Sequence, residues 1–475
     1  MKQKINEPVK RASSLDALRG YAILTMVLSG TIAEKVLPGW MYHAQVPPPL
    51  HKFDPSVFGI TWVDLVFPFF LFAMGAAFPF SIGKKLSDKK GIYKAVFDSI
   101  IRGIQLTFFA IYIQHLYPWV IREPQNVTAW ILTLFAFLLL FPMFMQLPGN
   151  LSQTLRLIIK LLAYATGVFM LLTITYAGER RFDPAFSNII ILLLANMAIF
   201  GSLAYIFTFK NPVARVAILA FVMAVFLGST SEGSWNQWLF NYTPVPWMYR
   251  FDYLKYLFIV IPGSFAGEYL LEWIKAPHHS VKNTGKNNYY PPVLLLFSIS
   301  LIVINLYGLY TRHLLANLAV TSGILLAGNY LLRKAETPEQ LLWKKLFVVG
   351  SCILMLGLFF EAFEGGIRKD YATYSYYLVT SGLAFMALIA FSITCDYYKW
   401  TRALNFLIMP GQNPMIAYVA PNMLVMPVLS LLGVAHYLGL LDENPWLGFL
   451  KGLIITSLVT LTAMFFTRIK WFWRT

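Results

Sequence analysis

Residues 59–75 read GITWVDLVFPFFLFAMG, an almost unbroken apolar run with a single carboxylate, Asp64, near its start. Such a run approaches the roughly 20 residues that a helix needs to cross the core of a bilayer. Other apolar runs of this kind are 128–147, 188–209, 293–310 and 448–466. Of the 475 residues, 58% are hydrophobic and 13% are charged, whereas soluble domains carry roughly 25% charged residues. The sequence therefore predicts an all-α, polytopic helical bundle that spans the lipid bilayer about 12–14 times.

The basic residues predict the orientation of the bundle. Lysine and arginine outnumber the acidic residues by 38 to 22, and in a membrane protein such residues concentrate in cytoplasmic loops. Basic clusters recur on alternate sides of the apolar runs, so placing them in the cytoplasm puts both termini there and leaves no need for a nucleic-acid partner. The segments expected in the cytoplasm include residues 1–14 and 276–291, and those expected on the outer face are 37–59, 231–250, 365–371 and 436–445.

No soluble domain remains beside the spans, so residues 1–475 are expected to form one transmembrane domain. The two cysteines, Cys352 and Cys395, fall inside expected spans, and no ligand spacing predicts a metal site. The motifs of Walker A loops, zinc peptidases and serine hydrolases do not occur in the sequence.

The first span begins with SSLDALRG (13–20), which places two charges at the membrane. Asp16 and Arg19 are three residues apart, so they share a helical face and can pair, and Ser13 or Ser14 could cap the helix start. A self-neutralising structural pair and a functional pair fit this spacing equally well. Further along, Arg102 would join Arg11 and Arg19 at the same membrane face. Three cations there suit the phosphates of a nucleotide-like ligand.

The outer loop before the second span carries the most suggestive chemistry. A carboxylate at the head of an apolar span needs a partner, and His51 or His43 from the preceding loop can supply one. A histidine oriented by an aspartate is a general base for an amine or hydroxyl nucleophile. The alternative, that Asp64 caps the helix and the histidines are ordinary loop residues, is equally open at this point.

A late span contains Gln412 and Asn413 immediately before Pro414. Proline cannot continue a helix without a lost hydrogen bond, so we expect a break at this point. Non-helical backbone at membrane depth must lie against protein or line a cavity.

Two motifs, RxxSLDxxRG at 11–20 and GITWVDLVFPFFLFAMG at 59–75, resemble those of the heparan-alpha-glucosaminide N-acetyltransferase family. The closer similarity is to its bacterial relatives, transmembrane acyltransferases described as DUF5009 or NagX-like proteins. The likeness continues at 366–377 and 411–418, whereas residues 119–250 match in hydropathy alone.

The resemblance implies transfer of acetyl from cytoplasmic acetyl-CoA to a glucosamine-like amino sugar across a bacterial inner membrane. The family's reactive histidine then falls on His51, with Asp64 beside it. An ungapped match places Asp54 at that position, so His51 requires a small insertion and His43 stays in contention. General-base catalysis and a covalent acetyl-histidine are both open. The residues expected to bind acetyl-CoA are Arg11, Ser14, Asp16, Arg19, Arg102, Gln105, Gln412 and Asn413.

Three alternatives remain beside this interpretation. The acyltransferase-3 class is similar at LDALRG (15–20), but its histidine further along the first span has no counterpart between Gly20 and Trp40. A transporter for an amino sugar would use Asp16, Arg19 and Asp64 to line its path. A structural or regulatory membrane protein would need none of this chemistry. A homodimer is compatible with the sequence but is not specified by it.

Overall fold

The computed structural model describes residues 12–34, 36–83, 85–86, 89–147, 151–276 and 289–474. Within these residues the structure is helical apart from two isolated β-bridges. Twelve of the described helices are long and apolar enough to cross a membrane. The predicted all-α membrane bundle is therefore confirmed. One shorter apolar helix of 17 residues, α8, is added to these twelve, so the number lies within the expected range.

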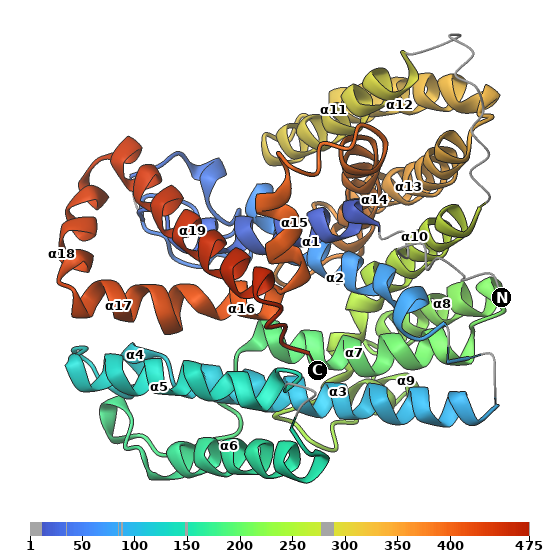
Figure 1. The fold of residues 1–475 in the computed structure, drawn as a ribbon. Coiled ribbons are helices and arrows are strands. Elements are labelled where there is room, and N and C mark those ends of the chain that lie inside the picture. Colours follow the sequence, from blue (N-terminus) through green and yellow to red (C-terminus); the bar gives the residue numbers. More distant parts are fainter. Residues whose placement is uncertain are drawn as a thin grey trace, which may run out of the picture.

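The long helices form the body of the bundle (Figure 1). They are α1 (Ser13–Ser29), α2 (Trp62–Ser81), α3 (Lys89–His115), α5 (Val127–Phe144), α6 (Gln153–Thr173), α7 (Ile189–Phe207), α8 (Pro212–Gly228), α10 (Leu257–Lys275), α11 (Tyr290–Tyr310), α12 (Leu314–Leu331), α13 (Pro338–Phe363), α14 (Tyr374–Phe391) and α19 (Pro445–Arg468).

Shorter helical segments complete the bundle. They are α4 (Pro118–Ile121), α9 (Trp235–Asn241), α15 (Asn405–Gln412), α16 (Pro414–Ala420), α17 (Met426–Leu431), α18 (Val434–Gly439), the turns η1 (Gly39–Met41), η2 (Ala177–Glu179), η3 (Phe251–Tyr256), η4 (Leu332–Lys334) and η7 (Leu440–Glu443), and the π-helical turns η5 (Ser392–Tyr397) and η6 (Pro421–Val425). Of these, α16, η6 and α17 together form the candidate span Pro414–Leu431.

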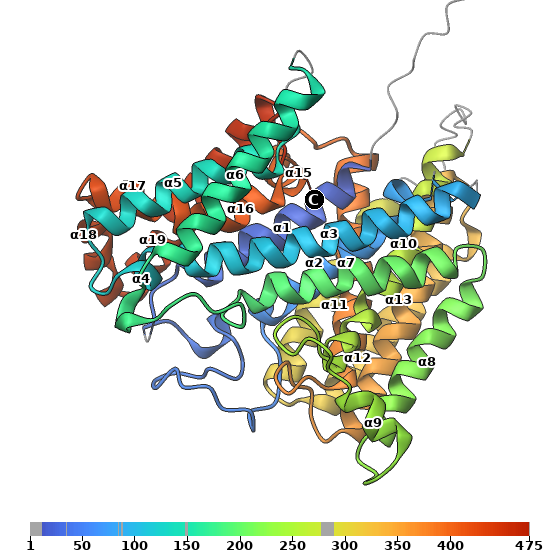
Figure 2. The same cartoon turned by 90° about the horizontal axis from the view of Figure 1, so that it is seen from below.

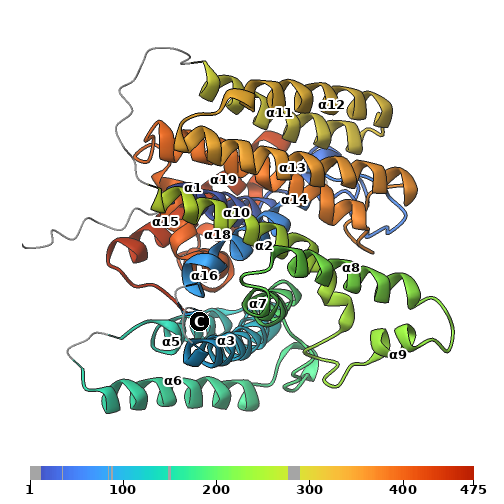
Figure 3. The same cartoon turned by 90° about the vertical axis from the view of Figure 1, so that its right-hand side faces the viewer.

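Helices α2 and α14 occupy the centre of the bundle. Most of each apolar stretch is buried, 78% for α2 and 83% for the span that contains α14, against 22% for α6 and for the span that contains α12. A helix that is apolar on all sides belongs in such an interior or against lipid. Figure 3 shows α11, α12 and α13 on one side of this centre, and α3, α5 and α6 on the other. The head of α2, where Asp64 lies, is therefore inside protein rather than against lipid.

Two glycines allow one close helix crossing in the bundle. Helix α1 meets α15 where a Cβ on Gly20 would lie 1.8 Å from the Leu407 carbonyl oxygen, and a Cβ on Gly411 would lie 1.8 Å from that of Asp16. Small residues let helix backbones approach in this way inside membranes. The two glycines come from the first and the last of the motifs in the sequence, so these motifs meet in space.

Replacing Gly20 with valine is expected to destabilise the protein by about 1–3 kcal/mol, because the added side chain overlaps backbone atoms that cannot move aside independently. The apparent melting temperature of the detergent-solubilised protein measures this effect. Gly323→Val in α12 is the matched control, since nothing lies within 4 Å of a Cβ at that position. Equal shifts for the two variants would contradict the proposed crossing.

The structure refines several expected boundaries. Helix α1 begins at Ser13 with Ala12 as its N-cap, whose side chain cannot accept a hydrogen bond, so the expected capping by Ser13 or Ser14 is wrong. Of the expected cytoplasmic connector, residues 277–288 lie outside the described residues, and its last two belong to α11. The expected break is confirmed: α15 ends at Gln412 and α16 begins at Pro414. The residue before a proline disfavours helical geometry, which explains this position.

The outer loops before α2 and α14 come together. The Gly59 amide donates to the Ile367 carbonyl oxygen over 2.8 Å, and Figure 2 shows both loops leaving the bundle on the same side as α9. Segments 37–59, 231–250 and 365–371, which are all expected on one face, therefore lie on one side of the bundle, and their assignment to the outer face stays a prediction. The two loops build the site described next.

Candidate functional site

Asp64 is fully buried at the first turn of α2, and its two oxygens have different roles. Oδ2 accepts hydrogen bonds from the Thr61 amide at 2.9 Å and the Ala44 amide at 3.2 Å. It therefore caps the helix, as one of the two sequence interpretations expects, and it also holds the preceding loop against the helix end.

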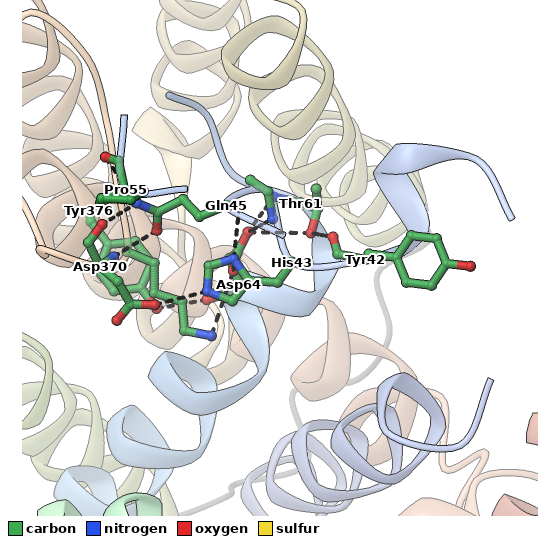
Figure 4. Close-up of polar contacts among 10 residues, drawn as sticks. Tyr42, His43, Gln45, Pro55, Thr61, Asp64, Asp370 and Tyr376 are labelled. Atoms are coloured by element: carbon green, nitrogen blue, oxygen red, sulfur yellow. Dashed lines mark hydrogen bonds and ion pairs between the residues drawn. The ribbon is translucent and has the colours of Figure 1, made fainter. Parts of the chain in front are cut away.

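The second oxygen of Asp64 faces two positively charged or chargeable groups. Oδ1 lies 3.4 Å from His43 Nδ1 and 3.7 Å from Lys369 Nζ (Figure 4). Within the described residues Oδ1 has no hydrogen-bond partner at ordinary distance. A buried carboxylate oxygen in this position is costly unless a proton or a cation approaches it.

His43 lies between two aspartates. Its Nδ1 accepts the Gln45 amide hydrogen at 3.0 Å, so in this state the proton resides on Nε2, which donates to Asp370 Oδ2 at 3.0 Å. The His43 side chain is 18% exposed and that of Asp370 is 47% exposed. Asp64 is thus the buried neighbour of the ring, and Asp370 is the solvent-facing one.

Hydrogen bonds between the loops fix the position of His43. Thr61 Oγ1 donates to the Tyr42 carbonyl oxygen at 2.7 Å, and the Asp370 amide donates to Gln45 Oε1 at 2.8 Å. The Gln45 side-chain amide in turn donates to the Asp370 carbonyl oxygen. From α14, the hydroxyl of Tyr376 donates to the Asp64 carbonyl oxygen at 2.9 Å. Figure 4 shows these groups converging from the two outer loops and the heads of α2 and α14.

The hydrogen bond from His43, together with the charge of Lys369, holds the pKa of the Asp370 carboxyl below its usual value. A carboxyl whose pKa is lower in the folded state stabilises the fold above its unfolded pKa of about 4, and this contribution is lost as the pH falls through the folded value. The difference in melting temperature between wild type and Asp370→Asn should therefore be largest near neutral pH and shrink below about pH 4. A difference that stays constant down to that pH would contradict the ion-pair assignment.

His51, the first choice as reactive histidine, lies elsewhere in the same loop. Its ring packs edge-on against Tyr42 with the centroids 4.4 Å apart. Asp54, at the ungapped family position, is exposed and is held by Ser56. Among the described residues, the histidine at ion-pair distance from Asp64 is His43. His43, the second candidate from the sequence, thus lies in the place beside Asp64 that was expected for His51. The contacts of Thr61 and Ala44 fix residues 42–44 at the head of α2.

A second cluster forms around the crossing of α1 and α15. We call it the cytoplasmic cluster after the side on which the basic residues predict it. Asp16 and Arg19 are paired at 3.8 Å, and Arg19 Nη1 donates to the Gly411 carbonyl oxygen at 3.2 Å. Gln412 Nε2 donates to Asp16 Oδ2 at 3.4 Å. Asp16, Arg19 and Gln412, three of the residues expected at the acetyl-CoA site, therefore lie together in one cluster although they come from opposite ends of the sequence.

A second cation approaches this cluster from α3. Arg102 lies close enough to Arg19 for their like charges to interact, and its Nε has no hydrogen-bond partner within the described part of the chain. Gln105 follows one turn along the same helix. Two neighbouring guanidinium groups are typical of an anion site.

The other expected acetyl-CoA residues are placed differently. Asn413 bonds the C-terminal segment through the Trp471 carbonyl oxygen at 2.8 Å and the Trp473 amide at 3.3 Å, so its side chain has a structural partner. Ser14 is buried in the first turn of α1, and Arg11 lies outside the described residues.

The sequence interpretation missed several participants. Gln45, Lys369 and Asp370 were given no role, although the last two lie in the stretch 366–377 that carries part of the resemblance. Asp396, which accepts the Ser13 amide hydrogen at 3.1 Å, was also missed. In the sequence Lys369, Asp370 and Asp396 are visible only as charged residues beside apolar spans. Such a position does not identify a partner several hundred residues away.

The two clusters lie at opposite ends of α1. A helix of 17 residues is about 25 Å long, and the hydroxyl of Tyr42 donates at 2.7 Å to the carbonyl oxygen of Ala33, just beyond the end of α1. The cytoplasmic cluster and the His43 cluster are thus separated by about one bilayer core.

Comparison with known proteins assigns a family. A family model described as "Domain of unknown function (DUF5009)" matches residues 11–270. The match includes Asp16, Arg19, His43 and Asp64, and it ends before the segments that carry Asp370 and Gln412. No curated protein matches the chain.

Proposed function

We propose that this chain, a multi-pass membrane protein that belongs to the DUF5009 family, transfers acetyl from cytoplasmic acetyl-CoA to the amine of a glucosamine-like sugar on the outer face. One observation carries the proposal: His43 is held between the buried Asp64 and the solvent-facing Asp370 at the outer end of the bundle. The choice of donor and acceptor rests on the resemblance of the two motifs to transmembrane N-acetyltransferases.

The geometry suits a general base on the outer side. The exposed carboxylate of Asp370 attracts the ammonium group of an amino sugar, which can replace His43 as its partner. With the ring proton moved to Nδ1 and directed at Asp64 Oδ1, Nε2 is free to accept a proton. The buried aspartate then orients the histidine and stabilises its charged form, as in a catalytic triad.

The proposed reaction is balanced without any further reactant. The acceptor nitrogen attacks the thioester carbonyl carbon, a C–N bond forms, and the C–S bond breaks. The ammonium loses one proton to solvent before the attack. His43 then takes a second proton from the nitrogen and returns it to the departing thiolate, so the products are an amide, free CoA and the proton released to solvent. Lys369, at 3.7 Å from Asp64 Oδ1, is a cation that could stabilise negative charge developing beside His43.

The cytoplasmic cluster supplies the donor side. Arg19 and Arg102 provide positive charge for phosphate groups, and Gln412 and Asp16 offer hydrogen bonds beside them. Because the two clusters lie at opposite ends of α1, the thiol arm of CoA has to extend along this helix toward His43.

The test uses the purified full chain in detergent with acetyl-CoA and glucosamine. We expect release of free CoA that depends on glucosamine and does not occur with N-acetylglucosamine, whose nitrogen is already acylated. The absence of acceptor-dependent CoA release with glucosamine, galactosamine and a glucosamine-terminated oligosaccharide would refute the proposal.

Transport of an amino sugar is the second candidate. The break between α15 and α16 and the π-helical η6 form a discontinuous helical region beside α1 and α19, and discontinuous helices are typical of transporter binding sites. Sealed vesicles that accumulate glucosamine without releasing CoA would favour this function over acetyl transfer.

A further inference from the structure

A cavity of about 330 Å³ lies at the outer ends of α1, α3 and α7, beside α4 and η6. Its volume is at the lower end of the range for small-molecule sites. None of the residues of the His43 cluster lines it. The cavity therefore requires an explanation of its own.

Aromatic rings form one wall of the cavity. Tyr117 and Trp119 stack with their centroids 4.7 Å apart and an interplanar angle of 19°. Trp119 is 39% exposed, whereas Tyr117 is buried. An interfacial membrane belt also uses such residues, but here the pair lines a concave space together with amide side chains.

Amide groups form another part of the lining. Asn188 Oδ1 accepts the Tyr418 hydroxyl hydrogen at 2.8 Å, whereas its Nδ2 has a contact of 3.5 Å with Gln114 Oε1, at the outer limit for a hydrogen bond. Asn422 lies on the π-helical η6, and the Tyr117 hydroxyl interacts with the side chains of Asn188 and Asn422. Short π-helical turns occur often at functional sites.

The lining has no formal charge. Its twelve residues include no aspartate, glutamate, lysine, arginine or histidine. A charged ligand would lose its hydration there without gaining a partner, whereas hydroxyl groups find both donors and acceptors among the amides. The rings offer apolar faces for the C–H side of a sugar ring.

The cavity is narrow toward the cytoplasm. Met26, Ile190 and Tyr418 also line an apolar space of only about 20 Å³, where Phe67 and Phe70 from α2 join them. In this state the cavity is therefore reached from the outer side.

We propose that this cavity is a binding site for a neutral, hydroxylated ligand of monosaccharide size, such as an N-acetylated sugar. The proposal concerns binding alone and holds whether or not the chain transfers acetyl. It is distinct from the His43 cluster, whose carboxylates favour a cationic amine.

Equilibrium dialysis of the purified full chain with labelled N-acetylglucosamine, without acetyl-CoA, tests the proposal. We expect saturable binding that glucose reduces by competition and that glucuronate, which is charged, does not. Trp119→Ala should weaken binding by about tenfold. Trp446→Ala, which removes an 82% exposed tryptophan that does not line the cavity, should leave binding unchanged.

A second variant keeps the test decisive if Trp119→Ala fails to fold. Gln114→Glu preserves side-chain size but introduces a carboxylate, so it should weaken N-acetylglucosamine binding and strengthen binding of cationic glucosamine. No saturable binding of any neutral sugar to folded wild-type protein would overturn the proposal. Equal losses in Trp119→Ala and Trp446→Ala would also overturn it.

Discussion

Replacing His43 with alanine is expected to lower the rate of acetyl transfer by about 10²–10⁴-fold, the usual contribution of a positioned general base. The reason is geometric: His43 is the imidazole at ion-pair distance from Asp64, and Asp370 marks its solvent-facing side. The rate of CoA release from acetyl-CoA in the presence of saturating glucosamine measures the effect.

His51→Ala is the matched control for this prediction. The residue belongs to the same outer loop, but its ring packs against Tyr42, so we expect the rate to change by only a few-fold. The melting temperatures of both variants show whether the loop remains folded. A large loss in His51→Ala with little change in His43→Ala would return the catalytic assignment to His51.

Replacing Arg102 with glutamine is expected to weaken CoA binding by about tenfold or more, since a hydrogen bond to a charged group contributes roughly 1.5–3 kcal/mol. Arg102 combines a positive charge near Arg19 with an Nε that has no hydrogen-bond partner in the described chain. Calorimetric titration of CoA into the detergent-solubilised protein measures the change, and higher salt should weaken wild-type binding more than that of the variant.

Arg333→Gln controls for the loss of a basic residue on the same face of the membrane. Arg333 is exposed at the end of α12, where its guanidinium lies over the ring of Tyr330, so CoA affinity should not change. Unchanged CoA affinity in both Arg102→Gln and Arg19→Gln would contradict the proposed phosphate site. This experiment does not concern the His43 cluster.

The sequence predicts the fold class well because apolar runs of bilayer length have few alternative structures. The positions of the basic residues predict which loops share a face of the membrane. In the structure the segments 37–59 and 365–371, which are both expected on the outer face, contact each other. The break before Pro414 also follows from local chemistry, since a proline lacks the amide that a continuous helix needs.

The choice between His43 and His51 shows where sequence reasoning stops. Both histidines are close to Asp64 along the chain, and the resemblance favours His51, although that assignment requires a small insertion. In the structure His43 lies beside Asp64 because of hydrogen bonds of the loop, in which Thr61 and Asp64 hold residues 42 and 44. Such contacts depend on the path of the loop, which its sequence does not specify.

Asp370 could not have been assigned from the sequence because it is 327 residues away from His43. The outer cavity could not have been assigned from the sequence either, since its lining comes from α1, α3, α4, α7 and the region around η6. A site assembled from several elements becomes visible only when the packing of those elements is known. In contrast, Asp16 and Arg19 are neighbours on one helix, and their pairing was predictable.

The most direct measurement uses proteoliposomes loaded with acetyl-labelled CoA, with glucosamine added outside. Acetyl transfer across the membrane predicts labelled N-acetylglucosamine in the outer solution and an equal amount of free CoA inside, and His43→Ala should abolish both. Accumulation of unmodified glucosamine inside the vesicles, with acetyl-CoA left intact, would contradict acetyl transfer and identify the chain as a transporter.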